Sequence, residues 1–317
     1  MKYFTGLLLL LSFASRSFAQ ESKPDTVKVG IYVTSIHDID FKEKEYTISF
    51  WLWLKYSKKA FDFERNLEVP QAKTVTKFFP TIDSSDGKIN MLMKLQCVMK
   101  DSWKILRFPF DRQKLRLSFE NSQYDSKSLV FVADTVGKHY GRFTINGWAI
   151  DSFNISVDKR LYETGFGDES LPEPKTEYSA YKVNIGIERN APWELFLKVF
   201  LGMYVSFLIS YVCFYIHADS IDARFGLSVG ALFAVIGNKY IVDSTLPDTS
   251  SISLVDNLHG LTLICIFAVI SCTAYSLQLA KKGRIKTANK FDMISAQVLL
   301  SVYVILNIWF ISQALRG

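Results

Sequence analysis

The sequence has few cysteines and histidines, the residues that form disulfide bonds and bind structural metal ions. It contains only four cysteines and four histidines in 317 residues. Three of the cysteines lie in apolar stretches and the fourth, Cys97, has no plausible partner, so we expect no structural disulfide. The histidines are far apart and show no metal-ligand spacing, so no metal site is predicted.

Signals of catalysis and of nucleic-acid binding are also scarce. No glycine-rich phosphate loop, internal repeat or low-complexity run is present. Residues 226–230 fit the G-x-S-x-G pattern of hydrolases, but they lie in an apolar span, whereas that motif needs a strand–turn–helix setting. The net charge of +6 comes from scattered basic residues with one dense cluster, near 281–290. We therefore expect no enzyme, no cofactor and no nucleic-acid partner.

What the sequence does contain indicates one soluble domain and one membrane domain. Mean hydropathy is +0.13, and charged residues make up 21 % of the chain. Residues 1–19 read as a signal peptide, with Lys2, an apolar run over Leu7–Leu11 and the small-x-small site Ser17-Phe18-Ala19. The alternative is a membrane anchor, which would need about 20 apolar residues.

Residues 20–190 are predicted to form a β-sandwich. Short segments with period-two alternation are separated by turn signals, and no long helical pattern appears. The expected strands cover 27–34, 46–56, 88–98, 114–119, 143–157 and 178–187. Many short strands at this spacing are typical of a sandwich.

Residues 191–317 are predicted to form a four-helix membrane domain. The apolar spans cover about 194–216, 224–244, 257–280 and 292–315. With the β domain outside, the loop after the third span lies in the cytoplasm. That loop carries Lys281, Lys282, Arg284, Lys286 and Lys290. The positive-inside rule requires this arrangement, so the topology also explains the basic cluster.

The second span differs from a lipid-facing helix. Gly226, Gly230, Phe233, Gly237 and Ile241 recur at steps of three and four, which places them on one face. A face of mostly small residues either packs closely against another helix or lines an aqueous path. The sequence leaves both alternatives open.

One loop resembles a known family. The pattern Phe108-Pro109-Phe110-Asp111-x-Gln113 resembles the signature loop of the pentameric ligand-gated ion channels, the Cys-loop receptor superfamily. The loop ends, Cys in animal members, are Lys100 and Lys114 here, so the disulfide is absent, as in prokaryotic members. Further matches are Gly147–Ile150, Arg189 before the first span, Arg224 and Leu246-Pro247. The first span lacks the family's usual proline, and the pore face carries three glycines.

The resemblance implies a homopentamer in the cell inner membrane, with the N-terminal domain in the periplasm or extracellular space. A small ligand or protons would open a pore for ions. The implied pore residues are Asp222, Gly226, Gly230, Phe233, Gly237, Ile241 and Asp243. Five copies of Phe233 would form the constriction, and rings of Asp222 and Asp243 favour cations. The alternative is a non-conducting periplasmic receptor on the same scaffold, with the glycines serving helix packing.

The resemblance also implies a ligand site and a coupling site. Candidate ligand residues are Trp51, Trp53, Phe79, Asn121, Tyr162 and Phe166. Aromatic residues bind cations through their ring faces, although for each of these rings taken alone the sequence favours a place in the sandwich core. Asn121 stands where the family has an aromatic residue, which argues against a neurotransmitter-type cage.

The implied coupling residues lie where the two domains meet. They are Phe108, Pro109, Phe110, Asp111, Arg189 and Pro247. We expect an ion pair between Asp111 and Arg189, whose role is either in gating or purely structural.

Overall fold

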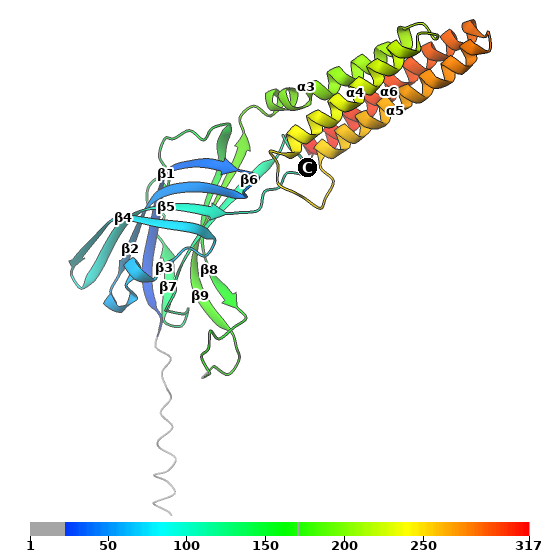
Figure 1. Ribbon diagram of the computed structural model, residues 1–317. Coiled ribbons are helices and arrows are strands. Elements are labelled where there is room, and N and C mark those ends of the chain that lie inside the picture. The colour runs from blue at the N-terminus through cyan, green and yellow to red at the C-terminus, as the bar shows by residue number, and fades with distance from the viewer. Residues whose placement is uncertain (1–22, 170, 317) are drawn as a thin grey trace, which may run out of the picture.

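The chain folds into a pair of β-sheets followed by a bundle of long helices (Figure 1). The computed structural model describes residues 23–169 and 171–316. The signal peptide predicted over residues 1–19 lies outside this part of the chain. The predicted fold class, a β-sandwich followed by a four-helix membrane domain, is confirmed.

The strands form two sheets. In spatial order, the five-stranded sheet contains β4 (Ala72–Ser85), β5 (Lys88–Lys100), β2 (Glu45–Tyr56), β1 (Asp25–Asp40) and β7 (Leu129–Ala133). The four-stranded sheet contains β3 (Leu67–Glu68), β6 (Arg112–Asn121), β9 (Thr176–Arg189) and β8 (Trp148–Tyr162). Neighbouring strands pair antiparallel except β1 and β7, which are parallel.

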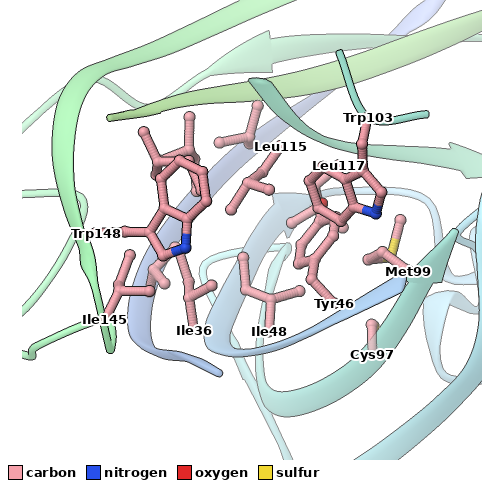
Figure 2. Close-up of a cluster of buried hydrophobic side chains, with 14 of the residues drawn as sticks. Ile36, Tyr46, Ile48, Cys97, Met99, Trp103, Leu115, Leu117, Ile145 and Trp148 are labelled. Carbon is pink, nitrogen blue, oxygen red and sulfur yellow. The ribbon is translucent and has the colours of Figure 1, made fainter. Parts of the chain in front are cut away.

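Alternation along the strands determines which side chains enter the core. On β2, Phe50, Leu52 and Leu54 are fully buried, whereas Trp51 and Trp53 lie on the opposite face and are partly exposed. Near the helical domain, the core holds a cluster from both sheets, with Trp103 and Trp148 at its two sides (Figure 2). Between β2 and β3, the short helices η1 (Lys59–Phe61) and α2 (Phe63–Asn66) add two buried phenylalanines.

Four helical segments are long and apolar enough to cross a membrane: α3 with η2 (Pro192–Tyr211 and Val212–Tyr215), α4 (Ile221–Asp243), α5 (Leu254–Lys281) and α6 (Ile285–Arg316). Proline opens α3, as is common at a first helical position. A capping box between Ser253 and Asp256 starts α5. Only a short turn separates α5 from α6, so the basic residues 286 and 290 lie on the first turns of α6.

Candidate pore, coupling and ligand sites

One face of α4 has no packing partner among residues 23–169 and 171–316. Phe233 is 67 % exposed and Ile241 64 % exposed. A Cβ atom added at Gly226, Gly230 or Gly237 would meet nothing within 4 Å. The three glycines therefore do not serve close packing within the subunit. They leave small residues on a face from which the exposed side chains of Phe233, Tyr240 and Ile241 project.

The opposite side of α4 packs into the bundle and carries Arg224. This side chain is 2 % exposed, and its Nη2 lies 2.7 Å from Asp292 Oδ2 on α6. Arg224 Nε also donates to the carbonyl of Ile216 at 3.0 Å, and Ser276 Oγ donates to Asp292 Oδ2 at 2.7 Å. Arg224 thus points away from the candidate pore face, and its charge is neutralised inside the subunit.

The two predicted acidic positions differ in their surroundings. Asp222, at the start of α4, is exposed and forms no ion pair within residues 23–169 and 171–316. Asp243, at the other end, lies 2.9 Å from Lys239 Nζ, which also reaches Asp256 on α5 at 2.7 Å. The outer end therefore carries two carboxylates for one ammonium group.

The predicted ion pair between Asp111 and Arg189 is present. Arg189 Nε lies 2.8 Å from Asp111 Oδ1, and the two side chains are 11 % and 1 % exposed. The guanidinium carbon is 4.2 Å from the ring centre of Trp148, with Phe108 and Phe41 at 4.9 and 5.2 Å. Arg189 is thus held by one carboxylate and three rings at the end of the β domain nearest the helices.

Several contacts join this region to the helices. The ring of Phe110 lies 4.7 Å from that of Trp193, at the start of α3. The Leu254 N–H at the start of α5 donates to the Leu106 carbonyl at 2.8 Å. Lys42 Nζ, in the β1–β2 turn, donates to the Ser244 carbonyl at 3.3 Å. The candidate coupling residue Pro109 lies in the same loop as Phe110, and Pro247 lies in the link between α4 and α5.

At the end of the β8–β9 hairpin, three aromatic rings pack edge to face. Tyr162 lies 5.5 Å from Phe166 and 5.6 Å from Tyr178, and Phe166 is 61 % exposed. Beneath them, Glu120 accepts a hydrogen bond from the Tyr162 hydroxyl at 2.9 Å and pairs with Arg160 at 2.7 Å. Exposed rings above a buried carboxylate suit a cationic group.

The predicted residues on the other sheet do not join this cluster within one chain. Trp51 and Trp53 lie on the outer face of β2, so they are not core aromatics, and Trp53 Nε1 donates to Asp134 Oδ2 at 3.0 Å. Phe79 is 71 % exposed on the edge strand β4, and among the described residues its ring contacts only Phe78. The structure thus places Phe79 on the sheet opposite Tyr162 and Phe166.

Asn121 has a structural task in this fold. It is 1 % exposed, and its Nδ2 donates to the Phe61 carbonyl at 3.0 Å. Its Oδ1 accepts the N–H groups of Gln123 and Tyr124 at 2.9 and 3.1 Å. The side chain caps the turn after β6 and lines no binding surface. The polar residue next to it, Glu120, faces the aromatic cluster instead.

The environment of Glu120 predicts a pH effect. Burial raises the pKa of this carboxyl, although Tyr162 and Arg160 oppose the shift. A carboxyl whose pKa is raised by folding contributes stability that is fully present below its unfolded pKa, about 4.3, and is lost as pH rises through the folded pKa. We expect stability, measured by thermal unfolding from pH 3 to 7, to fall with rising pH less steeply in Glu120→Gln than in the unaltered protein.

Glu177→Gln is the matched control. Lys159 lowers the pKa of this exposed carboxyl, so its stabilising contribution is lost as pH falls. The two variants should therefore alter the pH profile in opposite directions. Parallel profiles would contradict the assignment for Glu120.

Comparison with known proteins identifies the chain's relatives, although no family model matches it. A proton-gated ion channel of Gloeobacter violaceus is 25 % identical over 249 residues, which are 72 % of this chain and 66 % of the relative. Gamma-aminobutyric acid receptor subunit gamma-4 of Gallus gallus is 21 % identical over 279 residues, 78 % of this chain and 58 % of the relative. A glutamate-gated chloride channel of Drosophila melanogaster is 23 % identical over 192 residues, 58 % of this chain and 38 % of the relative.

The matched region thus spans between 38 % and 66 % of these relatives' own lengths. The β-sandwich and the four long apolar helices agree with the resemblance of the 108–113 loop. All four cysteines are free, and lysines stand at both ends of that loop. By sequence and fold together, the chain is a homologue of the pentameric ligand-gated ion channels, the Cys-loop receptor superfamily, of the prokaryotic type without the loop disulfide.

Proposed function

We propose that this chain is the subunit of a homopentameric cation channel in the cell inner membrane, opened by a small ligand or by protons from the periplasmic side. The observation that carries the proposal is the face of α4 without a partner, where three glycines meet open space and Phe233 projects. Five copies of this face around an axis would give a lumen with aromatic rings at two levels, Phe233 near the middle of α4 and Tyr240 two turns further on. Hydrophobic constrictions of this kind gate by excluding water.

The charges along α4 support cation selectivity. Asp222 is exposed at the cytoplasmic end, while Arg224 is paired inside the subunit with Asp292. At the outer end, Lys239 bridges the two carboxylates, Asp243 and Asp256, and the Asp243 side chain remains 51 % exposed. Acidic rings at both mouths attract cations and repel anions.

The ligand site is proposed at the Tyr162, Phe166 and Tyr178 cluster, above Glu120. Its chemistry favours an amine or another small cation. Trp51 and Trp53 of a neighbouring subunit would supply the facing wall, since they lie on the outer side of the other sheet. Protonation of the buried Glu120 is the second candidate trigger, and one relative is named as proton-gated.

Recording from the reconstituted full chain tests the proposal. We expect current that depends on pH or on a panel of small amines, with a reversal potential that follows the potassium gradient and not the chloride gradient. Silence from intact pentamers under all conditions would overturn the channel assignment. If a ligand still altered the structure of such silent pentamers, the alternative of a non-conducting receptor would replace it.

Phe233→Ala should produce leak current or easier opening. The ring is the largest side chain on the exposed face between Gly230 and Gly237, so its removal would widen the proposed constriction. The measurement is single-channel or flux recording without ligand. Leu232→Ala, one position away and only partly exposed, is the control. Unchanged resting current in Phe233→Ala would remove this ring from the gate.

A further inference from the structure

The β domain contains a cavity that does not include the Tyr162 cluster. It has a volume of about 650 Å³ and is lined by Tyr32, residues 137–142 and residues 151–153. Small-molecule pockets in proteins have volumes of roughly 300–1,000 Å³, so this one is large enough for a small organic ligand. None of its lining residues belongs to the pore, coupling or ligand sites described above.

The walls of this cavity are held in place by the sandwich. The loop between β7 and β8 runs along β1, where the Val33 N–H donates to the His139 carbonyl at 2.8 Å and the Gly141 N–H donates to the Val33 carbonyl at 2.9 Å. On β8, the ring of Phe153 stacks on that of His139, with 6.0 Å between the ring centres and 5° between the ring planes. Its centre lies 5.2 Å from that of the Tyr140 ring. The cavity is therefore formed before any ligand binds.

The charges in the cavity lack partners. Lys138, Arg142 and Asp151 line it, and none of the three forms an ion pair or side-chain hydrogen bond within residues 23–169 and 171–316. Two exposed positive side chains and one exposed negative side chain line the cavity, so it favours an anion.

A buried polar atom in the wall points to the same conclusion. His139 Nδ1 is shielded from solvent and has no hydrogen-bond partner among the described residues. Buried polar atoms in folded proteins nearly always have a partner, so an atom without one marks a place for a ligand or an ordered water. Around it, Tyr32, Tyr140 and Phe153 supply ring faces and edges.

We propose that this cavity binds a small aromatic carboxylate. Its carboxylate would bind to Lys138 and Arg142, since a guanidinium group holds a carboxylate through two parallel hydrogen bonds. Its ring would pack against Tyr140 and Phe153, next to His139. Asp151 on the rim disfavours additional negative charge, which limits the ligand to a single carboxylate.

The test uses 4-fluorobenzoate and the full chain in lipid nanodiscs, with binding followed by fluorine NMR and empty nanodiscs as the blank. We expect saturable binding, and binding at least about tenfold weaker for the neutral 4-fluorobenzamide, because hydrogen bonds to charged groups are the stronger ones. Acetate should compete only weakly, because it lacks the ring. Equal binding of the benzoate and the benzamide would overturn the proposal.

Three variants separate the cavity from general effects. Arg142→Gln should weaken 4-fluorobenzoate binding about tenfold. Asp151→Asn should strengthen it, a result that damage to the fold cannot produce. Lys127→Gln, an exposed charge outside the cavity, should leave it unchanged. If Arg142→Gln and Lys127→Gln behave alike, or Asp151→Asn weakens binding, the assignment fails. Because binding is measured without current, this outcome is independent of the proposed channel function.

Discussion

Asp292→Ala should destabilise the helix bundle by about 3–5 kcal/mol, the usual cost of removing one partner of a buried ion pair. The reason is that Arg224, 2 % exposed, would keep its charge with no carboxylate nearby. Asp292 also accepts the Ser276 hydroxyl, so α4, α5 and α6 would lose their common polar contact. The effect is measured as the midpoint of thermal unfolding and as the yield of intact oligomer in detergent.

Two further variants make this result specific. Asp243→Ala breaks an ion pair at the other end of the same helix, but that carboxylate is 51 % exposed, so the expected loss is about 1 kcal/mol or less. The double variant Arg224→Met with Asp292→Leu should recover most of the stability, because apolar residues often replace a buried pair without loss. Equal losses of stability in Asp292→Ala and Asp243→Ala would show that burial of the Arg224–Asp292 pair does not determine its contribution.

Asp111→Ala should abolish ligand-evoked opening while leaving the aromatic cluster at the far end of the β domain intact. Its carboxylate is 1 % exposed and is the ion-pair partner of Arg189, so the change would leave a guanidinium group among Trp148, Phe108 and Phe41 with no counter-charge. Removing one partner of such a pair costs about 3–5 kcal/mol. The adjoining Phe110 would then lose its fixed position against α3.

Glu188→Ala is the control for this prediction. Glu188 pairs with Arg112 in the same region at 3.0 Å, but both side chains are well exposed, so its loss should cost about 1 kcal/mol or less. Ligand binding and current are measured on each variant. Asp111→Ala should retain binding and lose current, whereas Glu188→Ala should retain both. Full current in Asp111→Ala would mean that the pair has only a structural role.

Much of the fold could be predicted from local patterns. Period-two alternation on β2 separates buried Phe50 and Leu52 from Trp51 on the outer face, and this pattern is legible in the sequence. The spacing of small residues on α4 likewise identified one distinct face. Whether that face meets another helix was open, because helical spacing gives no information about neighbours. A Cβ atom added at Gly226 or Gly230 would meet nothing within 4 Å, so within the subunit these glycines do not pack against another helix.

Contacts between distant segments could not be predicted in the same way. The orientation of Arg224 depends on Asp292, which is 68 positions away on another helix. Tyr178 and Glu120 were missed because they come from β9 and β6 and meet Tyr162 only through the pairing of these strands. The signal for Glu120 was its position at the end of a predicted strand, directly after the apolar residue Phe119. Conversely, Asn121 was selected by family position, which does not reveal its role as a turn cap.

The ion pairs at the two ends of α4 have a mechanical consequence. Near its cytoplasmic end the helix is tied to α6 through Arg224, and near its outer end to α5 through Lys239. A helix fastened at both ends to its own bundle cannot roll or bend independently without breaking one of these pairs. We therefore expect the helices of each subunit to move together. In the proposed pentamer, we expect the width of the pore to depend on how five such bundles tilt against one another, which places the energy barrier to opening between subunits.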